Sequence, residues 1–217
     1  LAEKLEPAEP GLYILKKERM IRHSCAAGSP QPRFVISGEI SSIYKKNDKV
    51  RKVHSLILLP SLEDAEILSR RLEAIGNIHS DGRPILGLDC HDLLAITLDA
   101  CPEAIYVPAH IWTPHFSLFG AFSGFDTIEE CYEELTPQVH ALETGLSSDP
   151  SMNRRLSALD SFHLISNSDA HSPAKLGREA NLFDIPMSYD GLYGAIQRGE
   201  GLAGTIEFFP EEGKYHF

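Results

Sequence analysis

Hydrophobic and polar positions change period repeatedly along the chain, which indicates strands that alternate with helices. Alternating apolar positions predict two strands joined by a hairpin between Phe34 and Leu59. Helical spacing then predicts a helix that opens at Ser61, where Ser61 and Asp64 resemble a capping box. Short apolar runs predict further strands at 84–88, 105–107, 139–143, 164–168 and 206–209, and further helices are predicted at 92–98, 127–135, 150–159 and 189–197. This order favours a mainly parallel α/β architecture.

The chain is long enough for one sizeable hydrophobic core and short for two domains. Of its 217 residues, 42% are hydrophobic, so we expect a single domain over residues 1–217. Residues 1–33 are rich in proline and glycine and are expected to be irregular. Residues 34–217 carry the pattern of strands and helices and are expected to form the body of the domain.

Charge and cysteine usage narrow the class of protein. The 20 basic and 31 acidic residues give a net charge of -11, which argues against a protein that coats nucleic acid. A nuclease stays possible, because bound divalent cations reverse the sign of an acidic site. The four cysteines form no CxxC pair, so reduced thiols are expected. No apolar run approaches the roughly 20 residues that span a bilayer, so we expect a cytoplasmic protein without a membrane partner.

Five residues with metal-binding side chains lie at the ends of strand-like apolar runs: Glu39, His54, His110, Asp169 and His171. Ends of different strands can converge on one point in a barrel-like α/β fold. Asp169 and His171 are the sharpest signal, because residues two apart on an extended segment point the same way. Each of the five also has an ordinary structural explanation, such as a core histidine or a solvent-exposed glutamate. The prediction of a metal cluster therefore rests on the coincidence of their positions.

A second set of residues is suited to phosphate. The segment Glu143–Pro150 ends one predicted strand and begins a helix, so its amides and hydroxyls can receive phosphate oxygens. The predicted substrate-binding or phosphate-binding residues are His115, Ser147, Ser148, Arg154, Arg155 and Arg178. Helix capping and surface charge explain each of them equally well when it is taken singly.

Carboxylates and imidazoles without thiolates suit Zn, Mn or Fe rather than copper. Such ions promote the cleavage of phosphate esters by activating water near neutral pH and by neutralising charge on the phosphoryl group. The sequence contains no nucleophile elbow, P-loop or dinucleotide-binding glycine pattern that would favour another chemistry. The residues therefore predict a metal-dependent phosphoesterase.

The same residues resemble those of the PHP (polymerase and histidinol phosphatase) phosphoesterases, and within that superfamily those of endonuclease Q and its bacterial relatives. The segments that carry the resemblance are Ser37–Ser41, Ala109–Pro114, Glu143–Pro150, Ser166–Pro173 and Leu176–Asn181. The resemblance implies a distorted (β/α)7 barrel with metals at the carboxyl ends of its strands. It implies hydrolysis of DNA 5′ to a deaminated base (uracil, hypoxanthine or xanthine) or an abasic site. Glu39 would then bridge two ions, His54 and His110 would be ligands, and Asp169 and His171 would serve two different ions.

The chain departs from the family in one motif. PHP proteins begin with an HxH pair on the first strand, and no HxH occurs in this sequence. The family also continues past the barrel into a cysteine-rich zinc element and a region that helps to hold DNA, neither of which is present. We therefore expect that the chain is truncated at both ends.

The resulting expectation is an α/β protein with a PHP-type distorted barrel, incomplete at its first strand, from a DNA-repair endonuclease. Its partner would be DNA that contains a damaged base, and its cofactors two to three divalent metal ions. The predicted catalytic residues are Glu39, His110, Asp169 and His171. Two rivals stay open: a PHP phosphatase of a small phosphomonoester, and a non-catalytic PHP module that is structural or positions DNA.

Overall fold

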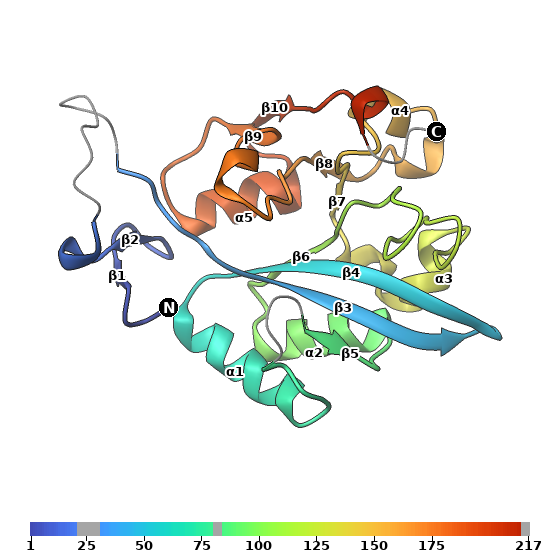
Figure 1. Cartoon of the computed structure of the whole chain (residues 1–217), viewed down its shortest axis with the longest axis horizontal. Helices are drawn as coiled ribbons and strands as arrows, with labels where there is room; N and C mark the ends of the chain where they lie inside the picture. Colours follow the sequence, from blue (N-terminus) through green and yellow to red (C-terminus); the bar gives the residue numbers. More distant parts are fainter. Residues whose placement is uncertain (21–30, 80–83, 214–217) are drawn as a thin grey trace.

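The longest elements of the molecule are the two strands of a hairpin, β3 (Ile36–Lys46) and β4 (Lys49–Leu59), which pair antiparallel along their whole length (Figure 1). The computed structural model describes residues 1–20, 31–79 and 84–213. Asn47 and Asp48 connect the two strands with φ angles of 52° and 59°, the left-handed values that a two-residue type I′ turn requires. The predicted hairpin is confirmed, and the turn fixes its register.

The hairpin is the centre of a four-stranded sheet with the order β5-β3-β4-β6. Strand β5 (Ile85–Leu86) is parallel to β3, and β6 (Ile105–Pro108) is antiparallel to β4. The remaining strands form two further pairs, β7 (Ala141–Glu143) parallel to β8 (His163–Ile165) and β9 (Ala180–Phe183) antiparallel to β10 (Leu202–Ile206).

The mixed α/β fold is confirmed, but the arrangement of its strands differs from the prediction. A mainly parallel sheet is wrong, because the longest strands are joined by a tight turn and must run antiparallel. No closed barrel forms among the described strands, which hydrogen-bond in four separate sheets. The strands after β6 are only three to five residues long, so they do not pair continuously around a ring.

Five α-helices flank the strands within the described residues: α1 (Leu62–Glu73), α2 (Cys90–Ala100), α3 (Ile128–Tyr132), α4 (Pro150–Asn153) and α5 (Tyr189–Arg198). The predicted cap of α1 is confirmed, because Ser61 Oγ accepts a hydrogen bond from the Asp64 amide at 3.0 Å. The helix predicted over 150–159 is shorter and ends at Asn153, and a separate 3-10 helix covers Ser157–Leu159. The strand predicted at 206–209 lies earlier, because β10 ends at Ile206.

Alternate residues of the hairpin face two different layers. Ile40, Val53 and Ile57 pack in a core with α1 and α2, whereas Leu58 packs with β6, β8 and α5. Figure 1 shows this division, with α1, α2 and β5 on one side of the hairpin and β7 to β10 with α5 on the other. The central sheet therefore has elements packed on both faces, and some polar side chains of the hairpin are buried, among them Ser41, Ser42, His54 and Ser55.

The segment expected to be irregular, residues 1–33, contains a small antiparallel pair in its described part. Strands β1 (Leu5–Pro7) and β2 (Tyr13–Leu15) pair with each other, and the Leu5 and Tyr13 side chains are buried. The Tyr13 hydroxyl accepts a hydrogen bond from the Leu62 amide at the start of α1, which ties the pair to the domain. Residues 21–30 lie outside the described residues.

The cysteines and the helices of the described residues bear on the expectations of reduced thiols and of no membrane span. Cys90, Cys101 and Cys131 are buried free thiols, and Cys25 lies outside the described residues. No described helix has the length and apolar character needed to cross a membrane.

Candidate metal centre

Glu39 and His54 come from the two strands of the hairpin and lie on the same face of the sheet. The register pairs Glu39 with Leu56 and Ser41 with His54, so Glu39 and His54 are diagonal neighbours across the strand pair. Both side chains are on the face that Leu58 presents to β6 and α5. The pleat of the hairpin therefore brings a carboxylate and an imidazole to one point.

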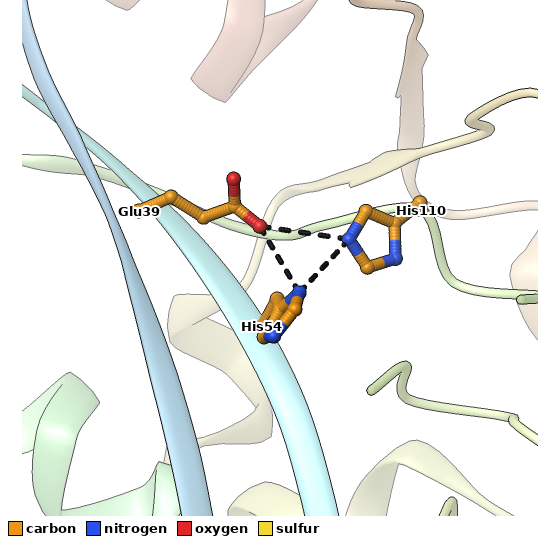
Figure 2. A group of neighbouring side chains, drawn as sticks. All are labelled: Glu39, His54 and His110. Carbon is orange, nitrogen blue, oxygen red and sulfur yellow. Dashed lines mark hydrogen bonds and ion pairs between the residues drawn. The ribbon is translucent and has the colours of Figure 1, made fainter. Parts of the chain in front are cut away.

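His110 completes a triangle of ligand atoms with these two residues (Figure 2). It lies just after β6, where the Ala109 amide donates a hydrogen bond to the His54 carbonyl at 3.0 Å. His54 Nδ1 is 3.1 Å from His110 Nε2 and 3.2 Å from Glu39 Oε1. His110 Nε2 is 3.5 Å from the same Glu39 oxygen. Both histidines are buried and Glu39 is half-buried.

The spacing of these three atoms fits a single divalent ion. With bonds of about 2.0–2.1 Å, tetrahedral geometry places neighbouring donors roughly 3.3–3.4 Å apart. The observed separations of 3.1, 3.2 and 3.5 Å bracket that value. One carboxylate and two imidazoles suit Zn, Mn or Fe, and three protein ligands leave room for a substrate oxygen.

The orientation of His110 is fixed by its second ring nitrogen. His110 Nδ1 lies 3.0 Å from Thr113 Oγ1, and that hydroxyl donates its own proton to the His115 carbonyl at 2.8 Å. The Thr113 oxygen therefore accepts from Nδ1–H of His110, which leaves the Nε2 lone pair directed into the triangle. His54 is held differently, because the Phe116 ring stacks on it at 4.7 Å between centroids.

Negative charge around His110 favours a cation at this point. Burial by itself lowers the pKa of the His110 imidazole, but the hydrogen bond with Glu39 and the charges of Glu143, Glu39 and Asp169 outweigh burial and raise that pKa. A divalent ion is attracted by the same carboxylates and binds the neutral imidazole. Metal and proton therefore compete for His110.

The backbone of His110 is held by Glu143, a buried carboxylate at the end of β7. Glu143 Oε2 accepts from the His110 amide at 2.8 Å, and Glu143 Oε1 accepts from Asn167 Nδ2 at 2.7 Å. Burial raises the pKa of Glu143, although both of these hydrogen bonds act in the opposite direction. Gly145 has φ of 64°, and a Cβ there would lie 2.5 Å from His110 Cβ, so the chain approaches His110 as only glycine allows.

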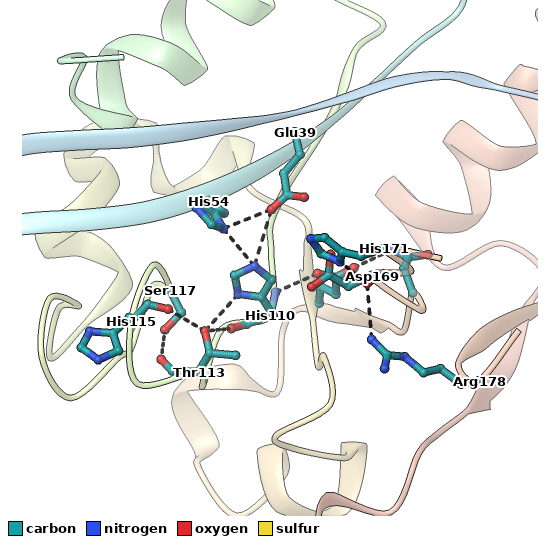
Figure 3. Close-up of polar contacts among 11 residues, drawn as sticks. Glu39, His54, His110, Thr113, His115, Ser117, Asp169, His171 and Arg178 are labelled. Carbon is teal, nitrogen blue, oxygen red and sulfur yellow. Dashed lines mark hydrogen bonds and ion pairs between the residues drawn. The ribbon is translucent and has the colours of Figure 1, made fainter. Parts of the chain in front are cut away.

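Asp169 and His171 lie beside the triangle rather than in it. Asp169 borders two cavities of about 380 Å³ and about 390 Å³, and His110 borders both of them as well. His171 lines the second cavity, its side chain is 77% exposed, and its Nδ1 is 2.9 Å from the Asp169 carbonyl. Figure 3 shows both residues on the side of His110 away from Thr113. The structure thus brings three of the five predicted ligands into contact and places the other two around the same cavities.

Two of the predicted ligands have a strained backbone. His110 and Asp169 have φ angles of 32° and 43°, in a region that residues other than glycine rarely adopt. Arg178 Nε and Nη2 donate to the carbonyls of Ser168 and Asp169, at 2.8 and 3.3 Å, and so hold the second turn in place. Such strain is found most often where a functional site requires it.

The predicted phosphate-binding residues fall into two groups. His115, Ser147 and Arg178 line the cavity of about 390 Å³, which His54, His110 and Asp169 also line. Ser148 and Arg154 donate hydrogen bonds to backbone carbonyls of their own segment, and Arg155 is exposed and borders neither cavity. The first group therefore borders the same cavity as three of the predicted metal ligands, whereas the second group borders neither cavity.

The sequence interpretation missed three residues that support the ligands: Thr113, Phe116 and Asn167. Thr113 and Phe116 follow His110 in a loop with no periodic signal, so only the tertiary structure shows that they contact the two histidines. For Glu143 the sequence offered a signal, since a glutamate that ends a buried strand needs hydrogen-bond donors.

A second buried carboxyl group, Glu179, gives the stability of the protein a predictable dependence on pH. Burial, followed by the charge of Glu207, raises the pKa of Glu179 from 4.5 to about 7. Between these values the folded chain holds a proton that the unfolded chain has released, so this group makes folding less stable as pH rises from 4.5 to 7. We expect Glu179→Gln to be more stable than the wild type by about 1–2 kcal/mol at pH 8 and nearly equal at pH 4.5.

Urea unfolding of both proteins at the two pH values checks this prediction. Titrating groups that do not interact with Glu179 are common to the two proteins, so their contributions cancel in the difference between them. A difference that is constant from pH 4.5 to 8 would show that the carboxyl group of Glu179 titrates at its ordinary pKa.

Comparison with known proteins finds curated relatives and a similar solved structure. No protein-family model matches the chain. Two curated relatives are uncharacterised proteins: YqxK of Bacillus subtilis, 34% identical over 132 residues, and MJ0043 of Methanocaldococcus jannaschii, 30% identical over 144 residues. These alignments cover 59% and 60% of the chain but only 32% and 18% of the relatives, so the chain spans less than a third of either.

A solved structure is similar over nearly the whole chain. It is the lesion-specific endonuclease PfuEndoQ from Pyrococcus furiosus, with a TM-score of 0.76 and 26% sequence identity. The match covers 99% of this chain and 48% of that protein, so the chain corresponds to about half of it. The chain therefore has a mixed α/β fold similar to that of a lesion-specific endonuclease, with a group of three possible metal ligands.

Proposed function

We propose that this chain is the catalytic part of a metal-dependent nuclease that incises DNA 5′ to a deaminated base or an abasic site. The observation that carries the proposal is the triangle of Glu39, His54 and His110, within a fold similar to that of a lesion-specific endonuclease. The proposal includes membership of the PHP superfamily, uracil, hypoxanthine and xanthine as the lesions, and a cytoplasmic location.

Glu39, His54 and His110 would hold one divalent ion, and Asp169 with His171 would hold a second at the border of the same cavities. Divalent ions at such ligands neutralise charge on a phosphoryl group and make water more acidic. The polypeptide itself would position the substrate. Arg178 and Ser147 line the cavity of about 390 Å³ beside the triangle, where a phosphodiester can receive hydrogen bonds.

Cleavage of a damaged oligonucleotide tests the proposal. Single-stranded and double-stranded DNA with one deoxyuridine or deoxyinosine is incubated with the chain, and with the product of its full reading frame, in the presence of Mn, Mg or Zn. We expect incision 5′ to the lesion. We expect Asp169→Ala to slow it by more than the roughly 10- to 100-fold typical of changes to outer partners of a metal site.

The surface variant Arg155→Ala is the matched control, because Arg155 is exposed and borders neither cavity. Turnover of small phosphate monoesters without DNA cleavage would instead identify a phosphatase. Inactivity of both proteins on both substrates would favour a non-catalytic module.

A further inference from the structure

The loop after His110 presents an exposed aromatic stack next to the metal centre. The Phe122 ring lies on the His115 ring with 4.6 Å between centroids and 11° between planes. Phe122 is 74% exposed, more than any other large hydrophobic side chain among the described residues. His115 therefore supports one face of the Phe122 ring, and the other face is open.

This stack adjoins the cavity of the metal centre. His115 lines the cavity of about 390 Å³ together with His54, His110 and Asp169. Figure 3 shows His115 on the opposite side of His110 from Asp169. A ring that stacks on Phe122 would therefore lie next to His115, a residue that lines the same cavity as three of the predicted ligands.

The loop is built so that Phe122 is held in its exposed position. The Phe122 amide donates to the Pro114 carbonyl at 3.2 Å, and the Gly124 amide donates to the Gly120 carbonyl at 2.7 Å. A Cβ at Gly120 or Gly124 would come within 3.0 Å of backbone atoms of the loop, so the turn is closely packed. The backbone that carries Phe122 is therefore held in place by hydrogen bonds and close packing.

Two cationic side chains near the cavity indicate the class of ligand. Lys52 Nζ lies 5.4 Å from the centre of the ring of Phe116, which lines the cavity, and Arg178 lines the cavity itself. An aromatic face beside cationic side chains is the combination that binds single-stranded nucleic acid, in which bases stack and phosphates contact cations. A neutral apolar partner would not use these charges.

We propose that Phe122, supported by His115, is a stacking platform for a base of the DNA strand whose phosphodiester lies at the metal centre. The inference deepens the proposed function and rests on it. It adds a binding site for an unpaired base outside the triangle of Glu39, His54 and His110. Stacking is tolerant of sequence because every base has an aromatic face.

The test is equilibrium binding of a short single-stranded oligonucleotide that contains 2-aminopurine, at one fixed salt concentration and without added metal. Base stacking quenches 2-aminopurine fluorescence, so the readout does not depend on cleavage. We expect Phe122→Ala to weaken binding by about 5- to 150-fold and to remove the quenching. Phe122→Trp keeps a stacking face and is expected to retain both.

Two controls separate stacking from other effects. Phe209→Ala removes another phenylalanine that is 70% exposed and should bind like the wild type. An oligonucleotide with abasic sites in place of its bases should lose its dependence on Phe122. Equal affinity and quenching in the wild type and Phe122→Ala would overturn the platform, as would an equal loss of affinity for the abasic oligonucleotide.

The platform and the proposed function can fail separately. If the wild type incises damaged DNA but Phe122→Ala binds the probe normally, the platform is wrong and the nuclease stands. If Phe122→Ala loses quenching while the wild type cleaves no DNA, the platform stands as a nucleic-acid site and the nuclease proposal fails.

Discussion

Glu39→Gln is expected to abolish metal binding at the triangle and, with it, phosphodiesterase activity. The substitution keeps the shape of the side chain but replaces the anionic oxygen that lies 3.2 Å from His54 Nδ1 and 3.5 Å from His110 Nε2. A neutral amide neither balances the charge of a divalent ion nor matches the ligand strength of a carboxylate. We expect activity to fall by more than about 100-fold, beyond the range typical of changes to outer partners of a metal site.

Thermal unfolding with and without added Zn or Mn measures the loss of binding directly. A metal at about 100 times its Kd stabilises the folded wild type by about 2.7 kcal/mol. For a chain of this size that raises the Tm by roughly 5–10 °C. Glu39→Gln should show little of this increase, whereas Glu63→Gln, which makes the same charge change at an exposed position of α1, should behave like the wild type. A full increase in Tm for Glu39→Gln would mean that the ion binds elsewhere.

Glu143→Gln is expected to have the second largest effect, and it acts through His110. Both carboxylate oxygens of Glu143 accept from N–H donors, one from the His110 amide and one from Asn167. Glutamine has only one acceptor oxygen, so its own amide group must face one of these donors in the buried interior. We expect a loss of about 2–4 kcal/mol in the free energy of unfolding and a metal affinity lower by roughly 10- to 100-fold.

Urea unfolding and metal titration of Glu143→Gln check the two parts of this prediction separately. Glu103→Gln is the matched control, because the Glu103 side chain is exposed. If Glu143→Gln were as stable as the wild type and bound metal normally, the Glu143 carboxylate would not be what holds the His110 backbone.

The hairpin part of the metal centre could be predicted from the sequence, because local rules determine it. Alternation gave the two strands, and a two-residue turn at Asn47 and Asp48 leaves a single register, in which Glu39 and His54 share a face. The sequence interpretation placed the hairpin correctly but did not use its turn to derive this adjacency. The helix cap at Ser61 was predictable for the same reason.

The rest of the candidate site and of the fold depends on contacts between segments far apart in the sequence. The spacing of hydrophobic residues does not indicate such contacts. His110 and Asp169 adopt positive φ at the ends of their segments, and the enrichment of Asp and His in that conformation does not identify which of these residues adopt it. The strands that follow β6 are short, which accounts for the four separate sheets where a closed barrel was expected. Arg154 looked available for phosphate, but its guanidinium donates to two carbonyls and, unlike Arg178, it borders neither cavity.

Two of the three candidate ligands come from one hairpin, so they can come together earlier in folding than the third. Glu39 and His54 are joined by a tight turn, so they can meet as soon as that hairpin forms, within microseconds. His110 is 56 residues beyond His54 and requires that β6 has docked on β4. A partly synthesised chain would therefore hold an ion only weakly with two ligands. Strong binding, and any cleavage that depends on it, would begin only when the later segment closes the triangle.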